Sequence, residues 1–351
     1  MSKEKKYRIG TYLILIPAIL FLFPKAYAQH ESKTINDSWK FHQGECEAAS
    51  SATYDDSAWN SIHLPHTWNT DAYTEKKYYQ GTGWYRRTLM LPQHWQGKQV
   101  FLKLDAASKA ATIYINGKEV GEHNGGYTAC TFDITSLCSF NSPNSLAIRV
   151  DNARQDIPPI SADFTFFGGI YRDVWLTAVS KQHFHLTNHS SDGIFISTPQ
   201  VSEEKGTILI RGEIKNDAVQ KASLELEHIV YNPDGSIAQT QKQSIQIKGG
   251  ELYSFHTETT PILSPRLWTP ETPHLYRVES ILRDKKTKVI LDRSNHHTGF
   301  RWFGFDGKTG FSLNGKPYKL RGICRHQDQK PIGVALTDEM HRRDMKLMKE
   351  M

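Results

Sequence analysis

The residues best suited to chemistry form a short polar run near the end of the chain, Arg325-His326-Gln327-Asp328. They follow an apolar segment, residues 318–323, that predicts a strand. Polar side chains just past the carboxyl end of a strand are typical of the site face of an α/β barrel. The alternative is a strand that runs into an ordinary solvated loop, and the residue types alone favour that alternative.

A second candidate for chemistry is Asp163, which precedes an aromatic run at residues 164–167 and the pair Gly168-Gly169. A carboxylate beside aromatic rings is suited to a hydroxyl-rich ligand, because its oxygens accept hydrogen bonds while the rings cover the apolar face of a sugar. A surface aspartate before a strand is equally consistent with the pattern.

Other polar residues are better explained by structural roles. His183 and His185 would share one face of a strand, as metal ligands can, but we predict no metal site there. Arg172 and Asp173 are expected to be a structural pair or two separately satisfied side chains, and residues 65–69 a packed loop. The sequence contains no phosphate-binding loop, nucleophile elbow or dinucleotide fingerprint.

These candidates must be positioned by elements that are almost all strands. Residues 34–180 show short aromatic or β-branched runs that are broken by turn residues, and Asn116-Gly117 predicts a tight hairpin. Residues 181–300 alternate apolar and polar side chains over five to seven further strands, with a turn at 233–235. The patterns predict a jelly-roll β-sandwich followed by a smaller immunoglobulin-like β-sandwich.

The pattern changes after residue 300. A second Asn-Gly hairpin is predicted at 311–318, and the strand at 318–323 follows it. Residues 337–351 predict a helix with Thr337 or Asp338 as its cap. Strand, polar loop and helix would make one β/α unit without the parallel neighbour that such a strand requires, so we expect residues from about 318 onward to be poorly packed.

The first 28 residues have the pattern of a cleavable signal peptide. A basic start precedes an apolar run at 9–23, and Ala26-Tyr27-Ala28 supplies small residues for cleavage. We therefore predict a periplasmic or secreted protein with no stable membrane span after cleavage. The segment also carries +4 of the net charge of +6, so the remainder is nearly balanced and no nucleic-acid partner is expected.

The four cysteines, Cys46, Cys130, Cys138 and Cys324, are too few for a disulfide-framed fold. Cys130 and Cys138 could pair in an oxidising compartment, although buried free thiols are the favoured interpretation. No spacing matches a structural zinc site.

Several ordered motifs together resemble one known family. The motifs are Leu64-Pro65-His66-Thr67-Trp68-Asn69, Gly83-Trp84-Tyr85-Arg86-Arg87, Asn116-Gly117, Gly125-Gly126-Tyr127, Gly168-Gly169-Ile170-Tyr171-Arg172-Asp173-Val174, Leu267-Trp268-Thr269-Pro270, Pro273-His274-Leu275-Tyr276, Gly299-Phe300-Arg301, Leu313-Asn314-Gly315-Lys316 and Arg321-Gly322-Ile323-Cys324-Arg325-His326-Gln327-Asp328. Residues 36–351 resemble the N-terminal part of a family 2 glycoside hydrolase of the β-galactosidase-like kind.

The resemblance implies a mainly β chain with four parts. These are a signal peptide (1–28), a jelly-roll sugar-binding domain (29–180), an immunoglobulin-like β-sandwich domain (181–300), and the truncated start of a (β/α)8 TIM barrel that carries catalysis (301–351). The family hydrolyses β-glycosides with retention, using two Glu residues on later barrel strands. The chain is therefore expected to contain neither catalytic residue and to be inactive alone.

The resemblance also implies three substrate-binding residues. His326 resembles a barrel-strand histidine that touches the sugar, Asp163 resembles an aspartate that the jelly-roll domain inserts into the active site, and Asp328 is a weaker candidate. No cofactor is required, although a sodium or magnesium ion near Asp163 is compatible with the resemblance. The expected substrate is a terminal β-galactoside in a β-linked oligosaccharide or glycoside.

Several alternatives stay open at this point. The chain could instead be a non-catalytic carbohydrate-binding protein, or a relative of the β-glucuronidase or β-mannosidase type. The expected protein partners are a second copy, which would make a homo-oligomer, or a complementing barrel chain.

Overall fold

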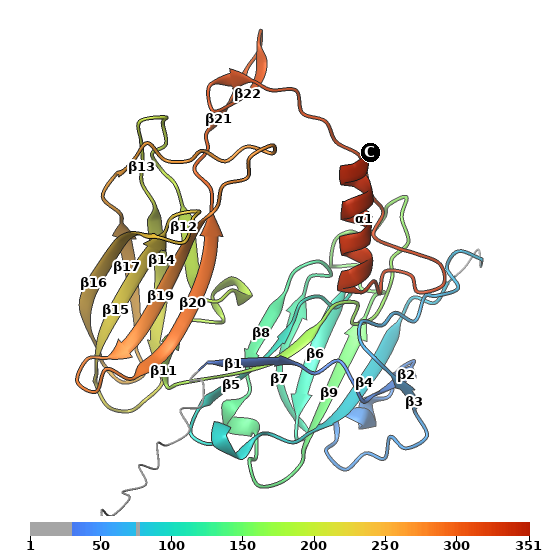
Figure 1. Ribbon diagram of the computed structural model, residues 1–351. Coiled ribbons are helices and arrows are strands. Elements are labelled where there is room, and N and C mark those ends of the chain that lie inside the picture. The colour runs from blue at the N-terminus through green and yellow to red at the C-terminus, as the bar shows by residue number, and fades with distance from the viewer. Residues whose placement is uncertain (1–29, 75–77) are drawn as a thin grey trace, which may run out of the picture.

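A computed structural model describes residues 30–74 and 78–351, so the predicted signal peptide lies outside the described residues. The described chain is mainly β, as predicted, and its strands form two separate sandwiches that lie side by side (Figure 1). Asp292 of the second sandwich links the two sandwiches. Its side chain accepts a hydrogen bond from Phe184 N of the same sandwich at 2.8 Å and pairs at 2.7 Å with His30, the first residue that the structure describes. In the described part of the chain, no helix is long and apolar enough to cross a membrane.

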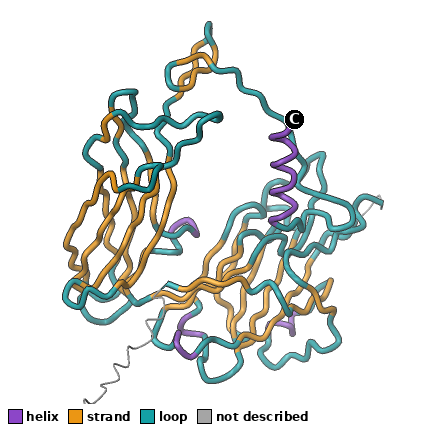
Figure 2. The backbone as a smooth tube through the Cα atoms, viewed as in Figure 1, coloured by secondary structure: helices purple, strands orange, loops and turns teal. Residues whose placement is uncertain are grey.

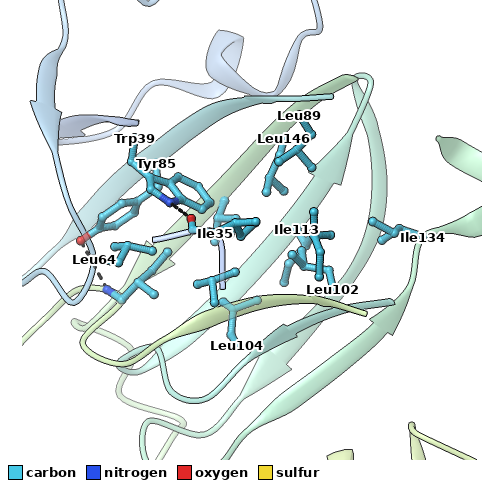
Figure 3. Close-up of a cluster of buried hydrophobic side chains, with 14 of the residues drawn as sticks. Ile35, Trp39, Leu64, Tyr85, Leu89, Leu102, Leu104, Ile113, Ile134 and Leu146 are labelled. Atoms are coloured by element: carbon cyan, nitrogen blue, oxygen red, sulfur yellow. Dashed lines mark hydrogen bonds between the residues drawn. The ribbon is translucent and has the colours of Figure 1, made fainter. Parts of the chain in front are cut away.

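The first sandwich packs two antiparallel sheets around aromatic and branched side chains. Trp39, Tyr85, Ile113 and Leu146 are fully buried between the sheets, and the Trp39 indole donates to the Ile35 carbonyl at 2.6 Å (Figure 3). One sheet has the order β1 (Glu31–Thr34), β10 (Val174–Val179), β5 (Gln99–Leu104) and β8 (Cys130–Asp133). The other has the order β3 (Asn60–Ile62), β2 (Trp39–Gln43), β4 (Thr82–Leu89), β9 (Asn144–Asp151), β6 (Ala110–Ile115) and β7 (Lys118–Asn124).

Turns in the first sandwich follow the residue types. The hairpin between β6 and β7 is confirmed, because Asn116 and Gly117 adopt the positive φ angles of 52° and 79° that a tight turn needs. Three short 3-10 turns complete this part: η1 (Glu47–Ser50), η2 (Gln93–Trp95) and η3 (Thr135–Leu137). All four cysteines are free thiols, so the Cys130–Cys138 disulfide that was left open is not formed.

The second sandwich has its own core, built from alternating side chains such as Leu224, Leu226, Ile245 and Ile247. One of its two four-stranded sheets has the order β16 (Ile237–Ile247), β15 (Ala222–Tyr231), β19 (Tyr276–Asp284) and β20 (Ile290–Thr298). The facing sheet contains β11 (Gln182–Phe184), β14 (Leu209–Asn216), β12 (Ile194–Ser197) and β17 (Leu252–Glu258), with η4 (Asn188–Ser190) and the pair β13 (Lys205–Gly206) and β18 (Ile262–Leu263) nearby. The predicted turn at 233–235 joins β15 to β16.

The last fifty residues differ from the predicted β/α unit. The Asn314-Gly315 hairpin is confirmed within a small sheet of β21 (Phe303–Asp306), β22 (Gly310–Leu313) and β23 (Lys316–Pro317). The predicted strand at 318–323 is wrong: this segment is loop, and Leu320 and Ile323 are each 62% exposed. The physical reason is that no strand among residues 30–74 and 78–351 lies beside this segment to pair with its backbone groups.

The predicted helix is confirmed as α1 (Asp338–Glu350), with Thr337 as its N-cap. It stands beside the first sandwich and far from the second, and a long loop connects it to β23 (Figure 2). None of its residues is buried. The segment before it is better packed than expected, since Leu336 is only 3% exposed.

Candidate sugar-binding site

The loop that carries Asp163 is held in place by its glycine pair. Gly168 N donates to the side chain of Asn69 at 2.8 Å, and the Thr67 hydroxyl donates to the Gly168 carbonyl at 2.7 Å. A Cβ atom at Gly168 would lie 2.0 Å from the Trp68 ring, and Gly169 adopts a φ of +127°. Residues 65–69 are therefore a packed loop, as predicted, and their role is to anchor the loop at 163–170.

Two further hydrogen bonds hold the aromatic part of the same loop. Phe166 N donates to the Tyr78 hydroxyl at 2.9 Å, and Asn152 donates from its amide to the Phe166 carbonyl at 2.8 Å. Phe167 is buried. The backbone that leads to Asp163 is thus tied to residues from three separate stretches of the first sandwich.

The C-terminal segment docks on this same structure. Gly333 has a φ of +57°, and a Cβ atom there would lie 2.8 Å from the Phe167 ring and 2.9 Å from the Thr67 methyl group. Gln329 N donates to the Gly333 carbonyl at 2.9 Å, which closes a turn directly after Asp328. Only a glycine fits this close approach, so residues 329–336 pack against Phe167 and Thr67 in one defined position.

Arg325 connects the polar run to α1. Its guanidinium donates to Asp344 through Nε at 3.0 Å and Nη2 at 2.5 Å, and its Nη1 lies 3.2 Å from His341 Nδ1. Hydrogen bonds from Arg325 keep the pKa of Asp344 below its ordinary value. This side chain therefore positions the run between the helix and the first sandwich.

Tyr73 positions Asp328 from the other side. Its hydroxyl donates to Asp328 Oδ2 at 2.8 Å, and its ring packs against Phe167 at a centroid distance of 6.2 Å. Burial and the adjacent Asp328 carboxylate both raise the pKa of Tyr73 above its usual range. The phenol therefore remains protonated and keeps donating over the whole physiological pH range.

These elements surround one cavity with a volume of about 510 Å³. The cavity brings together all three predicted substrate-binding residues, Asp163, His326 and Asp328, although Asp163 is far from the other two in sequence. The other lining residues are Ser108, Tyr127, Phe164, Thr165, Phe167, Tyr171, Arg172, Cys324, Arg325, Gln327 and Val334.

The cavity combines aromatic rings with both signs of charge. Arg172 lies over the Tyr171 ring at 5.6 Å and forms no ion pair with a carboxylate of the described residues. Asp173, its sequence neighbour, instead accepts a hydrogen bond from the Asn36 amide at 2.9 Å. Arg172 and Asp173 therefore do not pair with each other, and each has its own contact. Rings, carboxylates and a free guanidinium are the groups that bind the faces, hydroxyls and carboxylates of sugars.

A cation near Asp163 is not supported by a cage of protein ligands. Within residues 30–74 and 78–351, no group of three or more His, Cys, Asp or Glu side chains is arranged to hold a metal ion. His183 and His185 have carboxylate partners of their own, Asp217 at 2.9 Å and Glu213 at 2.7 Å. An ion near Asp163 stays a prediction, and it would need ligands from substrate, water or another segment.

Three aromatic residues of the site were missed by sequence reasoning. Tyr127 directly follows Gly125-Gly126, which indicated only a bend, and Tyr171 lies two residues after the pair Gly168-Gly169. A glycine pair near each tyrosine marks a place where the backbone bends or is closely approached, and this signal could have identified both residues as part of a site. Tyr73 had none, because its importance comes from a contact with a residue 255 positions away.

Comparison with known proteins identifies the two sandwiches. Residues 26–180 match the family model for the sugar binding domain of glycosyl hydrolases family 2, and residues 192–301 match a second model of glycosyl hydrolases family 2. A β-glucuronidase of Bacteroides fragilis is 34% identical over 98% of this chain and 48% of its own length. A β-galactosidase of Bacteroides ovatus is 28% identical over 92% of this chain and 37% of its own length.

Solved structures give the same result at higher identity. A crystal structure of a β-glucuronidase from Bacteroides uniformis is 72% identical, with a TM-score of 0.91, over 92% of this chain and 38% of that chain. The chain thus spans about half or less of the length of the relatives it matches.

Proposed function

Because this chain belongs to glycosyl hydrolase family 2, we propose that it forms the sugar-binding wall of a retaining β-glycosidase. The observation that carries the proposal is the single cavity that unites Asp163 with His326 and Asp328. These residues come from two distant stretches of the chain, and separate sets of contacts hold each stretch in place.

The role of this chain in the reaction is to bind and orient. Asp163 and Asp328 accept hydrogen bonds from sugar hydroxyls, and the surrounding rings cover the apolar face of the ring. Retaining hydrolysis also needs an acid and a nucleophilic carboxylate about 5 Å apart, and we assign both to the barrel segment that longer family members contain. The isolated chain is accordingly expected to bind glycosides without turning them over.

Of the two substrate classes among the relatives, β-glucuronides are favoured over the β-galactosides expected from the resemblance. The 72% identity is to a β-glucuronidase. The unpaired Arg172 guanidinium in the cavity can also form a charge-assisted, bidentate pair with a sugar carboxylate. A galactoside offers only a hydroxymethyl group at that position, so it would gain less from this arginine.

Binding measurements distinguish the substrate classes. Isothermal titration of the chain with methyl β-D-glucuronide and methyl β-D-galactoside should show tighter binding of the glucuronide. The Arg172→Gln variant should weaken glucuronide binding by roughly tenfold or more, as expected for a charge-assisted bond, and leave galactoside binding unchanged. Equal effects on both sugars, or tighter galactoside binding by the unsubstituted chain, would restore the galactoside assignment.

A second pair of measurements tests the site and the inactivity. Asp163→Asn should weaken binding of either glycoside, while Arg342→Gln, an exposed change on α1, should have no effect. Turnover of a chromogenic β-glucuronide or β-galactoside by the pure chain would contradict the assignment of the acids to the barrel segment of longer family members. Binding that is unchanged by Asp163→Asn and by Asp328→Asn would remove the cavity from the proposal.

Two further proposals concern the partner and the location of the chain. We propose that a complementing barrel segment, in the same or another chain, covers the cavity. Export to the periplasm or beyond rests on the pattern of residues 1–28 alone, and N-terminal sequencing of secreted material, with a start at Gln29, is its test.

A further inference from the structure

A second cavity, of about 420 Å³, lies on the first sandwich away from the site described above. Its floor is formed by strands β4, β9, β6 and β7, and its wall by the η1 segment. The residues that carry the argument are Trp84, Thr112, Tyr114, Glu119, Glu122 and Arg149.

The strand register places these side chains together on one face. Trp84 is paired with Arg149, Arg149 with Thr112, and Thr112 with Glu122, which makes one row across four strands. Directly paired residues point to the same side of a sheet. The alternate residues Ile113 and Ile115 are fully buried in the core, so the row and Tyr114 face outward.

An aromatic platform forms part of the floor. The Tyr114 ring stacks on the Trp84 ring at a centroid distance of 5.9 Å and an interplanar angle of 26°. Trp84 is itself held by a hydrogen bond from its indole to Glu45 at 3.0 Å. Tyr114 is only half-buried, and its hydroxyl has no hydrogen-bond partner in the described part of the chain. Burial, followed by the nearby Glu119, raises the pKa of Tyr114.

Thr112 is a buried polar group that lacks a partner. Its side chain lines the cavity although the residue is only 9% exposed, and its hydroxyl forms no hydrogen bond to any of the described residues. Thr112 is not among the residues with a fully enclosed, unpartnered polar atom, so its hydroxyl is open to the cavity and can hydrogen-bond to a ligand hydroxyl there.

The charges around the cavity select the ligand class. Glu45 holds Arg149 at 2.7 Å, and hydrogen bonds from Arg149 contribute most to lowering the pKa of Glu45 to about 2. Glu119 and Glu47 add further negative charge, whereas Glu122 is paired with Arg154 at 3.0 Å, and Arg149 is the one cation among the lining residues. Like charge disfavours a uronate or phosphate here, whereas fixed charged groups bind neutral hydroxyls well.

We propose that this cavity is a second, non-catalytic sugar-binding site for neutral oligosaccharides. One sugar ring stacks on Tyr114, and its hydroxyls bind Thr112, Glu119 and Arg149. None of the residues that line this cavity also lines the first one, so the two sites are separate. The proposal therefore does not depend on the function assigned to the first site.

Affinity electrophoresis and titration against a panel of neutral glycans test the proposal. The panel comprises lactose, cellotetraose, xylotetraose, mannotetraose, maltotetraose and chitotriose, with a digalacturonide as the anionic comparison. At least one neutral member should bind, and Tyr114→Ala should weaken that binding tenfold or more. The digalacturonide should not bind in a Tyr114-dependent way, because the glutamates repel it.

Two further variants separate loss of binding from loss of folding. Thr112→Val keeps the shape and the strand preference, so it should lower affinity while the thermal midpoint is unchanged. Thr88→Val, an exposed change on β4 of the same sheet, is its matched control and should leave affinity unaltered. Asp163→Asn should not affect this binding. The proposal is overturned if no neutral glycan binds in a Tyr114-dependent way, or if Asp163→Asn removes all binding.

Discussion

Helix α1 should be the least stable regular element of the described chain, and amide exchange can measure this. None of its thirteen residues is buried, and its side chains are attached to the rest of the chain through Arg325, which contacts Asp344 and His341. An isolated helix of this length is marginal in water, because most helical stability in proteins comes from packing an apolar face. The protection of α1 from exchange therefore depends on the cap and on the contacts of Arg325, of which the ion pair with Asp344 is the charged one.

The size of the protection can be worked out from these two contacts. The Thr337 cap contributes about 1 kcal/mol, and the Arg325–Asp344 pair, in which two N–H groups donate to one carboxylate oxygen, contributes about 1–3 kcal/mol. A total of about 2–4 kcal/mol corresponds to protection of roughly 30- to 700-fold. Core strands such as β6 open only with global unfolding, at about 5 kcal/mol or more, which gives several-thousand-fold protection.

Hydrogen exchange followed by mass spectrometry can compare α1 with β6 in one experiment. Asp344→Asn should lower α1 protection about tenfold or more and leave β6 unchanged. Arg342→Gln breaks the exposed pair with Asp338, in which both side chains are about three-quarters exposed, so it should change α1 protection less than about twofold.

Two results would refute this reasoning. The first is α1 protection equal to that of β6 in the monomeric chain, which would mean that the helix is packed by contacts other than those described. The second is an Asp344→Asn variant with unchanged protection, which would show that the ion pair does not hold the helix.

Three other predictions concern the fold and the first cavity. Gly168→Ala places a methyl group against the indole beneath it and should lower the free energy of unfolding by about 2–3 kcal/mol in urea, whereas Gly307→Ala, in open space, should change it by less than about 0.5 kcal/mol. Burial lowers the pKa of His228 to about 4. The contribution of the neutral His228 side chain to stability is therefore complete above about pH 6.5 and is lost as the pH falls toward 4. The His228→Leu variant should remove about 2–3 kcal/mol of the difference in unfolding free energy between pH 7 and pH 4.5. An unchanged difference would contradict this. Tyr73→Phe should weaken glycoside binding a few-fold with the thermal midpoint unchanged. In the double variant, Asp328→Asn should weaken binding little further, because Tyr73 acts by positioning Asp328. If the losses of binding free energy from the two substitutions add fully, Tyr73 has no positioning role.

The comparison between sequence and structure is clearest at the hairpins and the strands. Asn116-Gly117, Asn314-Gly315 and the helix cap at Thr337 were predictable, because each depends on the conformational preference of one or two residues. The sandwich strands were predictable for a similar reason, since alternation of apolar residues is a local pattern. The strand at 318–323 was not, because a strand exists only if another backbone pairs with it.

The candidate site, too, was predictable only in part from the sequence. Residue types and family resemblance were sufficient to select Asp163, His326 and Asp328 from the sequence. That the three line one cavity depends on contacts between distant residues, such as the close approach of Gly333 to Phe167 and the Tyr73–Asp328 hydrogen bond. The sequence by itself therefore determined the local elements and the candidate residues. Only the tertiary structure decided that the polar run after residue 324 lines one open cavity together with Asp163, because long-range packing has no local signal.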